Sequence, residues 1–267
     1  MGLTANLKKM KIKVLVDNTP GEKCQGAHGL SLWVEADLKV LLDLGPSDLF
    51  LKNATFMGVD VNQADAIVLS HGHWDHGNGL LHIQGKPLVT HPSAFVPRYR
   101  KRDFSPIGLP LDRAEASSKF KLQESKQPYW LSPQMVFLGE IPRNNDFEAQ
   151  TTPFCYKDGT DDFVPDDSAL VVVLPQGLVV ISGCAHAGIC NTVDYARRVC
   201  GDNRVLAVMG GFHLKKIDQT THKVMNWLKD TGVEHVMPFH CTSHEVIEQF
   251  NDLFGDEAVF CGTSLEF

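Results

Sequence analysis

Four side chains that commonly bind metal ions lie close together in the segment HGHWDH, which spans residues 71–76 and follows a short apolar stretch. In an extended turn alternate residues share one side, so His71 and His73 can hold one cation through their imidazole nitrogens. Asp75 and His76 fall at the start of a predicted helix and can face a second cation, because an oxygen and a nitrogen donor together suit Zn²⁺, Mn²⁺ or Fe²⁺. The spacing predicts a catalytic centre for two metal ions.

Such a centre carries a specific chemistry. Two divalent cations lower the pKa of a shared water toward neutrality and so supply hydroxide, and they polarise a carbonyl or phosphoryl oxygen. Asp75 can bind metal and also take the proton that the water releases. The alternatives are a histidine-rich surface turn and a structural zinc site, but structural zinc sites usually contain cysteine and none lies near this segment. Hydrolysis is therefore the default expectation.

Short apolar segments rich in valine, isoleucine and leucine predict the strands that must hold this centre. They lie at 12–16, 31–34, 40–44, 66–69, 87–90, 135–138, 169–174, 178–182, 205–209, 235–238 and 258–260. Helices are expected at 189–199, 220–231 and 243–254, each with an apolar face and a glycine at or soon after its end. The turn at 175–177 (PQG) predicts a hairpin. A single domain over residues 1–267 is the simplest organisation.

Residues 95–130 interrupt this pattern with proline, serine and basic side chains. Such a segment can be a solvated excursion, or it can be an insert that covers the active site as a lid or sets its specificity. The sequence leaves both interpretations open.

The overall composition argues against several classes of protein. Hydrophobic residues make up 43% and charged residues 21%, which is the balance of a globular chain. The net charge of -7 argues against a broad nucleic-acid-binding face. The sequence contains neither an apolar run of about 18 residues nor the apolar part of a signal peptide, so neither a membrane span nor export is expected. Seven cysteines without a C-x-x-C pair fit reduced thiols and predict a cytoplasmic protein.

The H-x-H-x-D-H pattern after a strand resembles the signature of the metallo-β-lactamase superfamily. The resemblance covers most of the chain and implies a four-layer αββα sandwich of the α/β (α+β) class, with the metals at one edge between two sheets. Residues 43–45 (DLG) look like the D-x-G turn of that superfamily. Further motifs resemble the branch of 7,8-dihydropterin-6-methyl-4-(β-D-ribofuranosyl)aminobenzene-5'-phosphate synthase-like proteins, and they lie at 29–31, 139–143, 166–170, 183–188, 210–214 and 240–242.

The resemblance also implies metal ligands outside residues 71–76: a mid-chain histidine for the first metal, a bridging aspartate at a strand end, and a last histidine near the C-terminus. His240 ends a predicted strand and matches the last of these. The segment 183–186 (GCAH) stands where many relatives have Gly-Asp. We expect His186 to be the third ligand of the first metal. Cys184 is then a small buried residue at a strand end, although its thiolate is a competing ligand.

Other polar residues near predicted strand ends are weaker candidates. Asp166 or Asp167 can reach the metal edge, and a water or hydroxide can join the metals if no carboxylate bridges them. His213 can protonate a leaving group or bind phosphate, or it can be an ordinary loop imidazole. Glu140 and Arg143 can form a substrate clamp, in which Arg143 would bind a carboxylate or phosphate with two hydrogen bonds, or only a structural ion pair.

The expected function is a dinuclear metal-dependent hydrolase that acts on a small phosphorylated or ester-like metabolite through a metal-bound hydroxide. The two ions are expected to be Zn²⁺, with Mn²⁺ or Fe²⁺ as alternatives. The resemblance implies a first alternative, a dihydropterin-linked synthase or transferase in which the metals act as Lewis acids on a pterin-like substrate. A second alternative is a metal-binding redox or sensor module, whose diiron relatives typically carry glutamate where this chain has His73.

Overall fold

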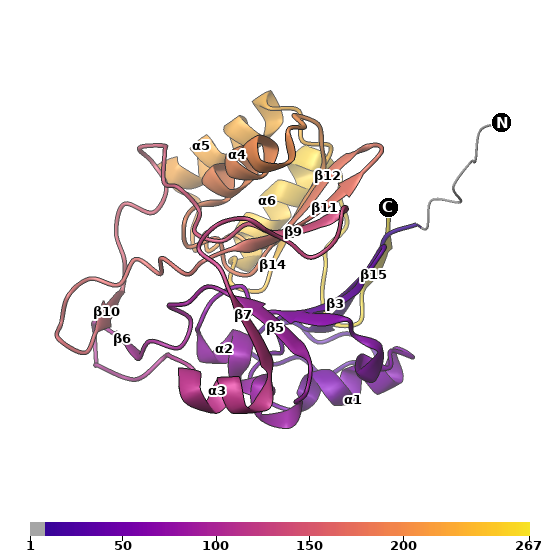
Figure 1. Cartoon of the computed structure of the whole chain (residues 1–267). Helices are drawn as coiled ribbons and strands as arrows, with labels where there is room; N and C mark the ends of the chain where they lie inside the picture. Colours follow the sequence, from indigo (N-terminus) through magenta and orange to yellow (C-terminus); the bar gives the residue numbers. More distant parts are fainter. Residues whose placement is uncertain (1–8) are drawn as a thin grey trace.

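Two β-sheets pack against each other in the computed structural model, which describes residues 9–267 (Figure 1). The first sheet has seven strands in the order β15–β1–β2–β3–β4–β5–β7. Their bounds are β15 (Ser264–Glu266), β1 (Lys11–Val16), β2 (Ser31–Glu35), β3 (Lys39–Leu42), β4 (Ala66–Val68), β5 (Pro87–Thr90) and β7 (Lys121–Glu124). The pairs β3–β4, β4–β5 and β5–β7 are parallel, so the carboxyl ends of β3 and β4 meet at one edge.

The second sheet has six strands in the order β14–β13–β12–β11–β9–β8. Their bounds are β14 (His235–Phe239), β13 (Val205–Gly211), β12 (Gly177–Ser182), β11 (Ala169–Leu174), β9 (Met135–Phe137) and β8 (Tyr129–Trp130). β12, β13 and β14 pair in parallel, which brings their carboxyl ends to a common edge. β11 and β12 form the antiparallel hairpin that the proline–glycine turn predicts.

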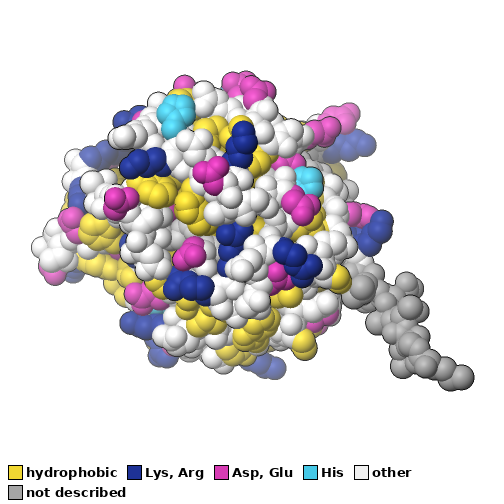
Figure 2. Space-filling view, turned by 90° about the horizontal axis from the view of Figure 1, so that it is seen from above, with side chains coloured by type: hydrophobic (Ala, Val, Ile, Leu, Met, Phe, Trp, Pro, Cys, Tyr) yellow, Lys and Arg dark blue, Asp and Glu magenta, His cyan; other side chains and the backbone are white. Residues whose placement is uncertain are grey.

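Helices cover the outer faces of both sheets (Figure 1). α1 (Leu49–Phe56), α2 (Trp74–Gly77) and α3 (Arg113–Lys119) lie on the side of the first sheet, together with the 3-10 turns η1 (Val61–Gln63) and η2 (Asn78–His82). α4 (Ile189–Cys200), α5 (Gln219–Asp230) and α6 (His244–Phe254) lie on the second sheet. Acidic and basic side chains are interspersed on the face seen from that side (Figure 2), as solvated helix faces require.

Alternating side chains on the strands divide the core into three layers. In β11, Leu170 and Val172 point between the sheets, whereas Val171 points toward the helices of the second sheet. In β3, Val40 lies between the sheets and Leu41 packs under the helices of the first sheet. This is the four-layer αββα sandwich expected from the sequence, and the predicted fold class is confirmed.

The three predicted helices are confirmed to within one residue at each end, because their stop signals are local. α4 ends at Gly201 and α6 at Gly255, both with left-handed backbone. The strand predicted at 258–260 is wrong. There Val259 is buried while Phe260 is 39% exposed, and the chain turns through Gly262 (φ 93°) before β15 pairs with β1.

The segment 95–130 is more regular than its composition indicates. It contains α3, β7 and the short strand β6 (Arg98–Arg100), which pairs with β10 (Phe154–Tyr156) at the end of the sandwich opposite the C-terminus (Figure 1). The start of α3 has a capping box in which Asp112 and Glu115 bond each other's backbone. The sequence reasoning missed this signal.

None of the helices within residues 9–267 combines the length and the apolar character that crossing a membrane requires. Residues 1–8 lie outside the described residues. The expectation that the chain has no signal peptide and the outer limits of the domain therefore stay predictions.

Candidate metal centre

The metal-binding side chains gather where strand ends of the two sheets meet. β4 leads into residues 71–76, and α2 begins at Trp74 within that segment. From the other sheet, β12 leads to Cys184 and His186, and β14 leads to His240. Residues far apart in sequence therefore converge because carboxyl ends of parallel strands share an edge.

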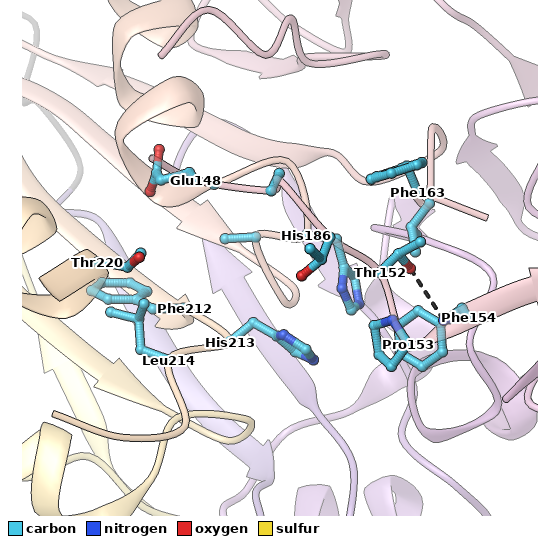
Figure 3. Close-up of a pocket in the computed structure, with 15 residues that line it drawn as sticks. Glu148, Thr152, Pro153, Phe154, Phe163, His186, Phe212, His213, Leu214 and Thr220 are labelled. Atoms are coloured by element: carbon cyan, nitrogen blue, oxygen red, sulfur yellow. Dashed lines mark hydrogen bonds between the residues drawn. The ribbon is translucent and has the colours of Figure 1, made fainter. Parts of the chain in front are cut away.

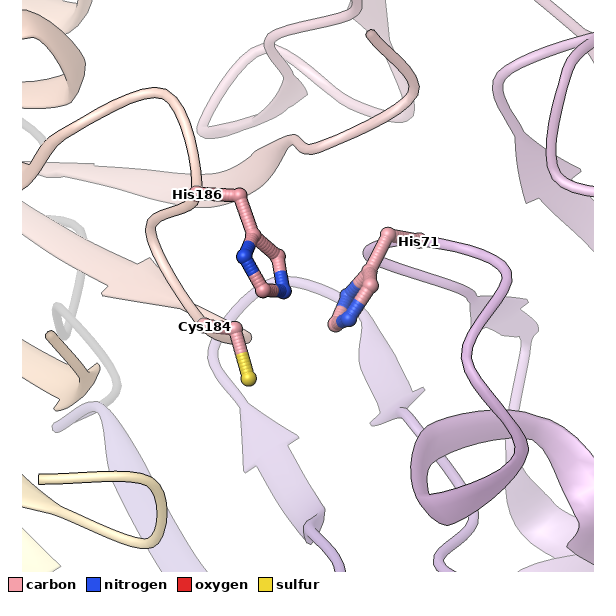
Figure 4. A group of neighbouring side chains, drawn as sticks. All are labelled: His71, Cys184 and His186. Carbon is pink, nitrogen blue, oxygen red and sulfur yellow. The ribbon is translucent and has the colours of Figure 1, made fainter. Parts of the chain in front are cut away.

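The donor atoms fall into two groups that share one residue. His71, Cys184 and His186 form the first group, and His76, Cys184 and His240 form the second; within each group the donor atoms lie within 4.8 Å of one another. Figure 4 shows the first three side chains pointing toward one another from different parts of the fold. His73 stands beside the first group, with its Nδ1 3.0 Å from His71 Nε2.

Asp43 orients one histidine of each group. His71 Nδ1 lies 2.9 Å from the Ser70 hydroxyl, which donates to Asp43 Oδ2 at 2.7 Å. Ser70 therefore accepts from His71, and the Nε2 lone pair of His71 faces the group. His76 Nδ1 lies 2.7 Å from the same carboxylate oxygen, so its Nε2 also faces inward. Carboxylate or hydroxyl partners of this kind are typical of metal-binding histidines.

His240 is oriented in the same way by Asn18, whose Oδ1 lies 3.1 Å from His240 Nδ1. As a result His240 Nε2 faces His76 Nε2 at 3.0 Å. Asp75 Oδ2 lies 3.8 Å from the His76 nitrogen and 3.7 Å from the His240 nitrogen. Two imidazole nitrogens and a carboxylate at these distances favour a positive charge among them, either a proton on His76 or a metal ion.

The electrostatics of the cluster favour a bound cation. Burial lowers the pKa of His71, His73, His186 and His240 well below the usual histidine value. Burial also acts to lower the pKa of His76, but the charges of two carboxylates, Asp43 and Asp75, outweigh it and raise the pKa to about 9.

The fit to a metal ion also rests on a buried atom without a partner. His186 Nε2 is buried and makes no hydrogen bond within residues 9–267, and His186 belongs to the first donor group. Unpaired buried imidazole nitrogens are costly unless a ligand binds them. Imidazole, thiolate and carboxylate donors together suit Zn²⁺ and neighbouring transition metals.

The backbone at the edge is unusual. Asp43, Ala185, His213 and His240 follow β3, β12, β13 and β14, and each has a positive φ, of 54°, 50°, 53° and 56°. At Gly72 a Cβ atom would lie 1.8 Å from the Ala94 carbonyl oxygen, so only glycine allows the loop to pass there. These sharp turns after the strands orient the side chains that follow them toward the candidate metal centre.

A cavity of about 780 Å³ opens next to the two groups. Its floor includes His73, Asp75, Cys184 and His186. Its walls combine the aromatic and apolar residues Trp74, Ile107 and Phe154 with the basic residues Arg100, Lys101, Arg102 and Lys215. The wall residues 100–107 come from the 95–130 segment, which therefore borders the candidate site. Its proposed action as a lid stays a prediction.

His213 lies between this cavity and a smaller pocket of about 140 Å³ (Figure 3). Its ring centroid is 4.5 Å from that of His186. Burial lowers the pKa of His213 to about 4, so its imidazole is neutral near pH 7. A neutral ring can donate one hydrogen bond to a substrate.

Two predicted substrate residues lie away from the cavity. Glu140 is 3.5 Å from His91 Nε2, and Arg143 donates to the carbonyl oxygens of Phe163 and Val164. Neither lines the cavity, and the structure does not bring the two side chains together as a clamp or an ion pair. We propose no substrate role for them.

The two aspartates that could have reached the metals hold loops instead. Asp166 Oδ2 accepts the Gly72 amide at 2.7 Å, and its other oxygen lies 2.8 Å from buried Arg98 Nη1. Asp167 Oδ2 accepts the Ala187 amide at 2.9 Å, and burial raises the pKa of Asp167 to about 6. Both support the loops that carry the histidines.

Sequence reasoning missed four residues of the site. Asp43 appeared only as part of a turn motif, and Asn18, Ser70 and Lys215 gave no signal. Asp43 could have been found, since an aspartate directly after a buried strand sits at the edge where ligands gather.

Comparisons with known proteins agree with this geometry. No family model matches the chain. An uncharacterized protein of Methanocaldococcus jannaschii is 32% identical over 253 residues, which cover 91% of this chain and 94% of that protein. A second protein of the same organism, named 7,8-dihydropterin-6-methyl-4-(beta-D-ribofuranosyl)-aminobenzene-5'-phosphate synthase, is 29% identical over 90% of both chains.

Solved structures show the same architecture. A metal-dependent hydrolase of the beta-lactamase superfamily is 31% identical and superposes with a TM-score of 0.86 over 97% of this chain and 99% of the other. The metallo-beta-lactamase fold protein YhfI from Bacillus subtilis is 14% identical, with a TM-score of 0.55 over 97% of this chain and all 100% of that one, and it supports the fold alone.

Proposed function

Because the chain belongs to the metallo-β-lactamase superfamily of metal-dependent enzymes, we propose that it is a dinuclear metallohydrolase for a small anionic metabolite, foremost a phosphorylated one. One observation carries the proposal: two converging donor groups open onto a cavity with a basic wall. His71, His73 and His186 would hold one ion, and Asp75, His76 and His240 the other. Two divalent cations, foremost Zn²⁺, would supply Lewis acidity and activate water.

The protein's own residues contribute positioning and proton transfer. Asp75 faces the second donor group and also lines the cavity, so its free carboxylate oxygen can take a proton from the attacking water. His213 lies beside His186 and lines the cavity, where its ring can hydrogen-bond a leaving group. Phe154 packs edge-on against His73, with ring centroids 4.8 Å apart, and helps to exclude water.

The basic wall supports an anionic substrate. Lys101 is paired with Asp161 at 2.7 Å and Arg102 with Asp103 at 3.0 Å, whereas Lys215 donates to the Cys241 carbonyl at 2.6 Å. Arg100 has no ion pair within the described residues. A cavity lined by one sign of charge concentrates ligands of the opposite sign, and arginine binds phosphate with two hydrogen bonds.

The test is a hydrolysis screen with bis-p-nitrophenyl phosphate, aryl phosphates, aryl esters and lactones, with Zn²⁺ or Mn²⁺ added. We expect turnover of a phosphorylated compound, its loss in Asp75→Asn, and a raised KM in Arg100→Ala. Arg198→Ala, on the outer face of α4, is the matched control and should leave KM unchanged. Turnover that survives Asp75→Asn would come from contamination or free metal and would remove the support for a hydrolase.

Metal analysis tests the centre itself. The purified protein should contain close to two transition-metal ions, and His73→Ala should lose most of them. Absence of transition metal in unchelated protein would refute the centre. Diiron charge-transfer bands in place of a colourless zinc or manganese protein would favour the redox or sensor module.

A second candidate function is a dihydropterin-linked synthase. One relative carries that name, and the flat aromatic rings of Trp74 and Phe154 border the cavity. Such rings can stack on a heterocycle such as a pterin. Tight binding of a reduced pterin together with no turnover in the hydrolysis screen would favour the synthase.

The cytoplasm is the proposed location. All seven cysteines are free within the described chain, and six of them are buried. Thiols of this kind stay reduced in that compartment.

A further inference from the structure

The structure assigns a metal-bridging role to the Cys184 thiolate. We propose that this sulfur binds both ions of the dinuclear centre, which goes against the sequence expectation that Cys184 only packs at a strand end. The inference rests on the proposed metal centre and adds its shared ligand.

The first support is the position of the sulfur. Cys184 is the one residue common to both donor groups found among residues 9–267. Its Sγ lies 3.2 Å from His76 Nε2 in the second group. Donor atoms around one tetrahedral zinc lie roughly 3.5 Å apart, given Zn–S and Zn–N bonds of about 2.3 and 2.0 Å. The sulfur is thus at ligand spacing from His76 of the second group, and it also lies within 4.8 Å of the donor atoms of its first-group neighbours, His71 and His186 (Figure 4).

The second support is the engagement of the nearby carboxylates. Asp43 accepts from Ser70 and His76, Asp166 from Gly72, and Asp167 from Ala187. Neither donor group found among the described residues contains a carboxylate, although Asp75 approaches the second from one side. An anionic ligand shared by two divalent cations lowers their mutual repulsion, and the Cys184 thiolate is the side chain placed to provide one.

The backbone explains how one short segment supplies two ligands. Ala185 has a left-handed backbone (φ 50°), and this turn lies between Cys184 and His186. In an extended chain residues i and i+2 would point the same way along one side. With the left-handed residue between them, His186 belongs to the first group alone while Cys184 belongs to both groups.

Cobalt substitution gives the test, because a thiolate bound to Co²⁺ adds a charge-transfer absorption in the near ultraviolet. Metal-free protein is titrated with Co²⁺ while this absorption and the bound cobalt are both measured. A bridging sulfur contributes to both ions, so the absorption should grow through two equivalents. Growth that stops after one equivalent would assign Cys184 to a single ion and overturn the bridge.

Variants identify the sulfur. Cys184→Asp should keep two cobalt ions without the charge-transfer absorption, because a carboxylate can also bridge. Cys184→Ala should bind the second ion at least ten- to hundred-fold more weakly, roughly the loss seen when even an outer partner of a ligand is removed. Cys241→Ser is the matched control, since Cys241 also lines the cavity but belongs to neither group. It should keep the absorption, and loss of the absorption in Cys241→Ser would overturn the assignment to Cys184.

The results distinguish failure of the Cys184 bridge from failure of the dinuclear metal centre. Two bound cobalt ions in the unmodified protein without charge-transfer absorption would refute the thiolate ligand and leave the centre intact. Unchanged affinity for two ions in Cys184→Ala would do the same. Failure of the unmodified protein to bind cobalt or zinc would refute the centre itself.

Discussion

At the scale of single residues, Asp43 links the two halves of the candidate centre. One of its oxygens receives both the Ser70 hydroxyl, which in turn contacts His71, and the His76 ring. Its other oxygen accepts the Ser70 amide at 2.8 Å. The residue does not itself enter either donor group, so its effect on metal binding acts through the orientation and charge of two histidines.

Replacing Asp43 with asparagine tests this role. Asparagine tolerates the left-handed backbone of this position but removes the charge that favours a cation. Metal affinity should fall by roughly ten- to hundred-fold for both ions. Competition with a chromogenic chelator measures the two metal affinities. Asp65→Asn serves as the control, because Asp65 directly precedes β4 and lies at the end of that strand away from the metal edge. Unchanged affinity would mean that the two histidines need no such support.

His213→Ala separates two roles of a neighbouring residue. Burial keeps the His213 ring neutral near pH 7 by lowering its pKa to about 4. We therefore expect His213 mainly to hold substrate, so that the alanine variant raises KM more than it lowers kcat. Steady-state kinetics on a substrate from the screen give both constants. A large loss in kcat with unchanged KM would instead identify His213 as the proton donor.

Site residues that are close together in the sequence could be predicted as a group, whereas contacts between distant positions could not. The four side chains at 71–76 could be predicted as a cluster because one turn holds them, whereas the approach of Cys184 to His76 joins positions on different sheets. His240 was named only through resemblance to a family. The partners Asn18 and Ser70 carry no sequence signal, since such polar side chains are common in every loop.

At the scale of elements, β6 is anchored by Arg98. Its guanidinium is fully buried, 2.8 Å from Asp166 and 3.5 Å from Asp162. Asp166 also holds the Gly72 amide, so the strand that borders the cavity is tied to the loop that carries the histidines. The sequence reasoning treated 95–130 as irregular because a buried arginine has no apolar period to reveal it.

Arg98→Met should destabilise the fold and loosen this wall. Removing the cation leaves two buried carboxylates uncompensated, which costs about 3–5 kcal/mol. Urea unfolding measures the loss, and KM for a substrate of the screen should rise as well. Arg113→Met, which removes an exposed pair with Glu124, is the matched control and should change stability little. Equal effects of the two substitutions would contradict the anchor.

At the scale of the whole molecule, the candidate metal ligands come from both sheets. Four of the candidate ligands, at residues 71–76, follow β4 of the first sheet, and the others, Cys184, His186 and His240, follow β12 and β14 of the second. Bound metal should therefore stabilise the whole sandwich, by about 2.7 kcal/mol at a metal concentration one hundred times Kd.

The fold class was predictable because the apolar strands, the hairpin turn and the helix stop signals are local features of the sequence. The relative placement of the sheets was not, because it depends on contacts distant in sequence.

The pH dependence of the chelated, metal-free protein follows from its histidines. Burial holds the pKa of four histidines below the value of 6.5 that they have in the unfolded chain; these are His71, His73, His186 and His240. Below pH 6.5 the unfolded chain therefore binds more protons than the folded protein, and the free energy of unfolding falls. The pKa of His76 is raised to about 9, so its contribution is present below pH 6.5 and is lost as the pH rises through 9.

Stability of the metal-free protein should therefore peak near pH 6.5, the unfolded pKa shared by these groups. Urea midpoints between pH 5 and 10 measure the profile. Protein reloaded with zinc should lose the decline above the peak, because the metal replaces the proton on His76. A midpoint of the chelated protein that rises steadily to pH 9 would contradict this interpretation.

The four left-handed residues at the metal edge place function and stability in opposition. A non-glycine residue in this conformation costs roughly 1–2 kcal/mol, and Asp43, Ala185, His213 and His240 all adopt it. Ala185 is the one of the four without a polar side chain, so Ala185→Gly should relieve strain at little chemical cost. Glycine at the other three would also relieve strain but would delete the working side chains. Laboratory evolution for heat resistance alone should therefore erode activity first at these three turns, while selection for turnover should retain their strained residues.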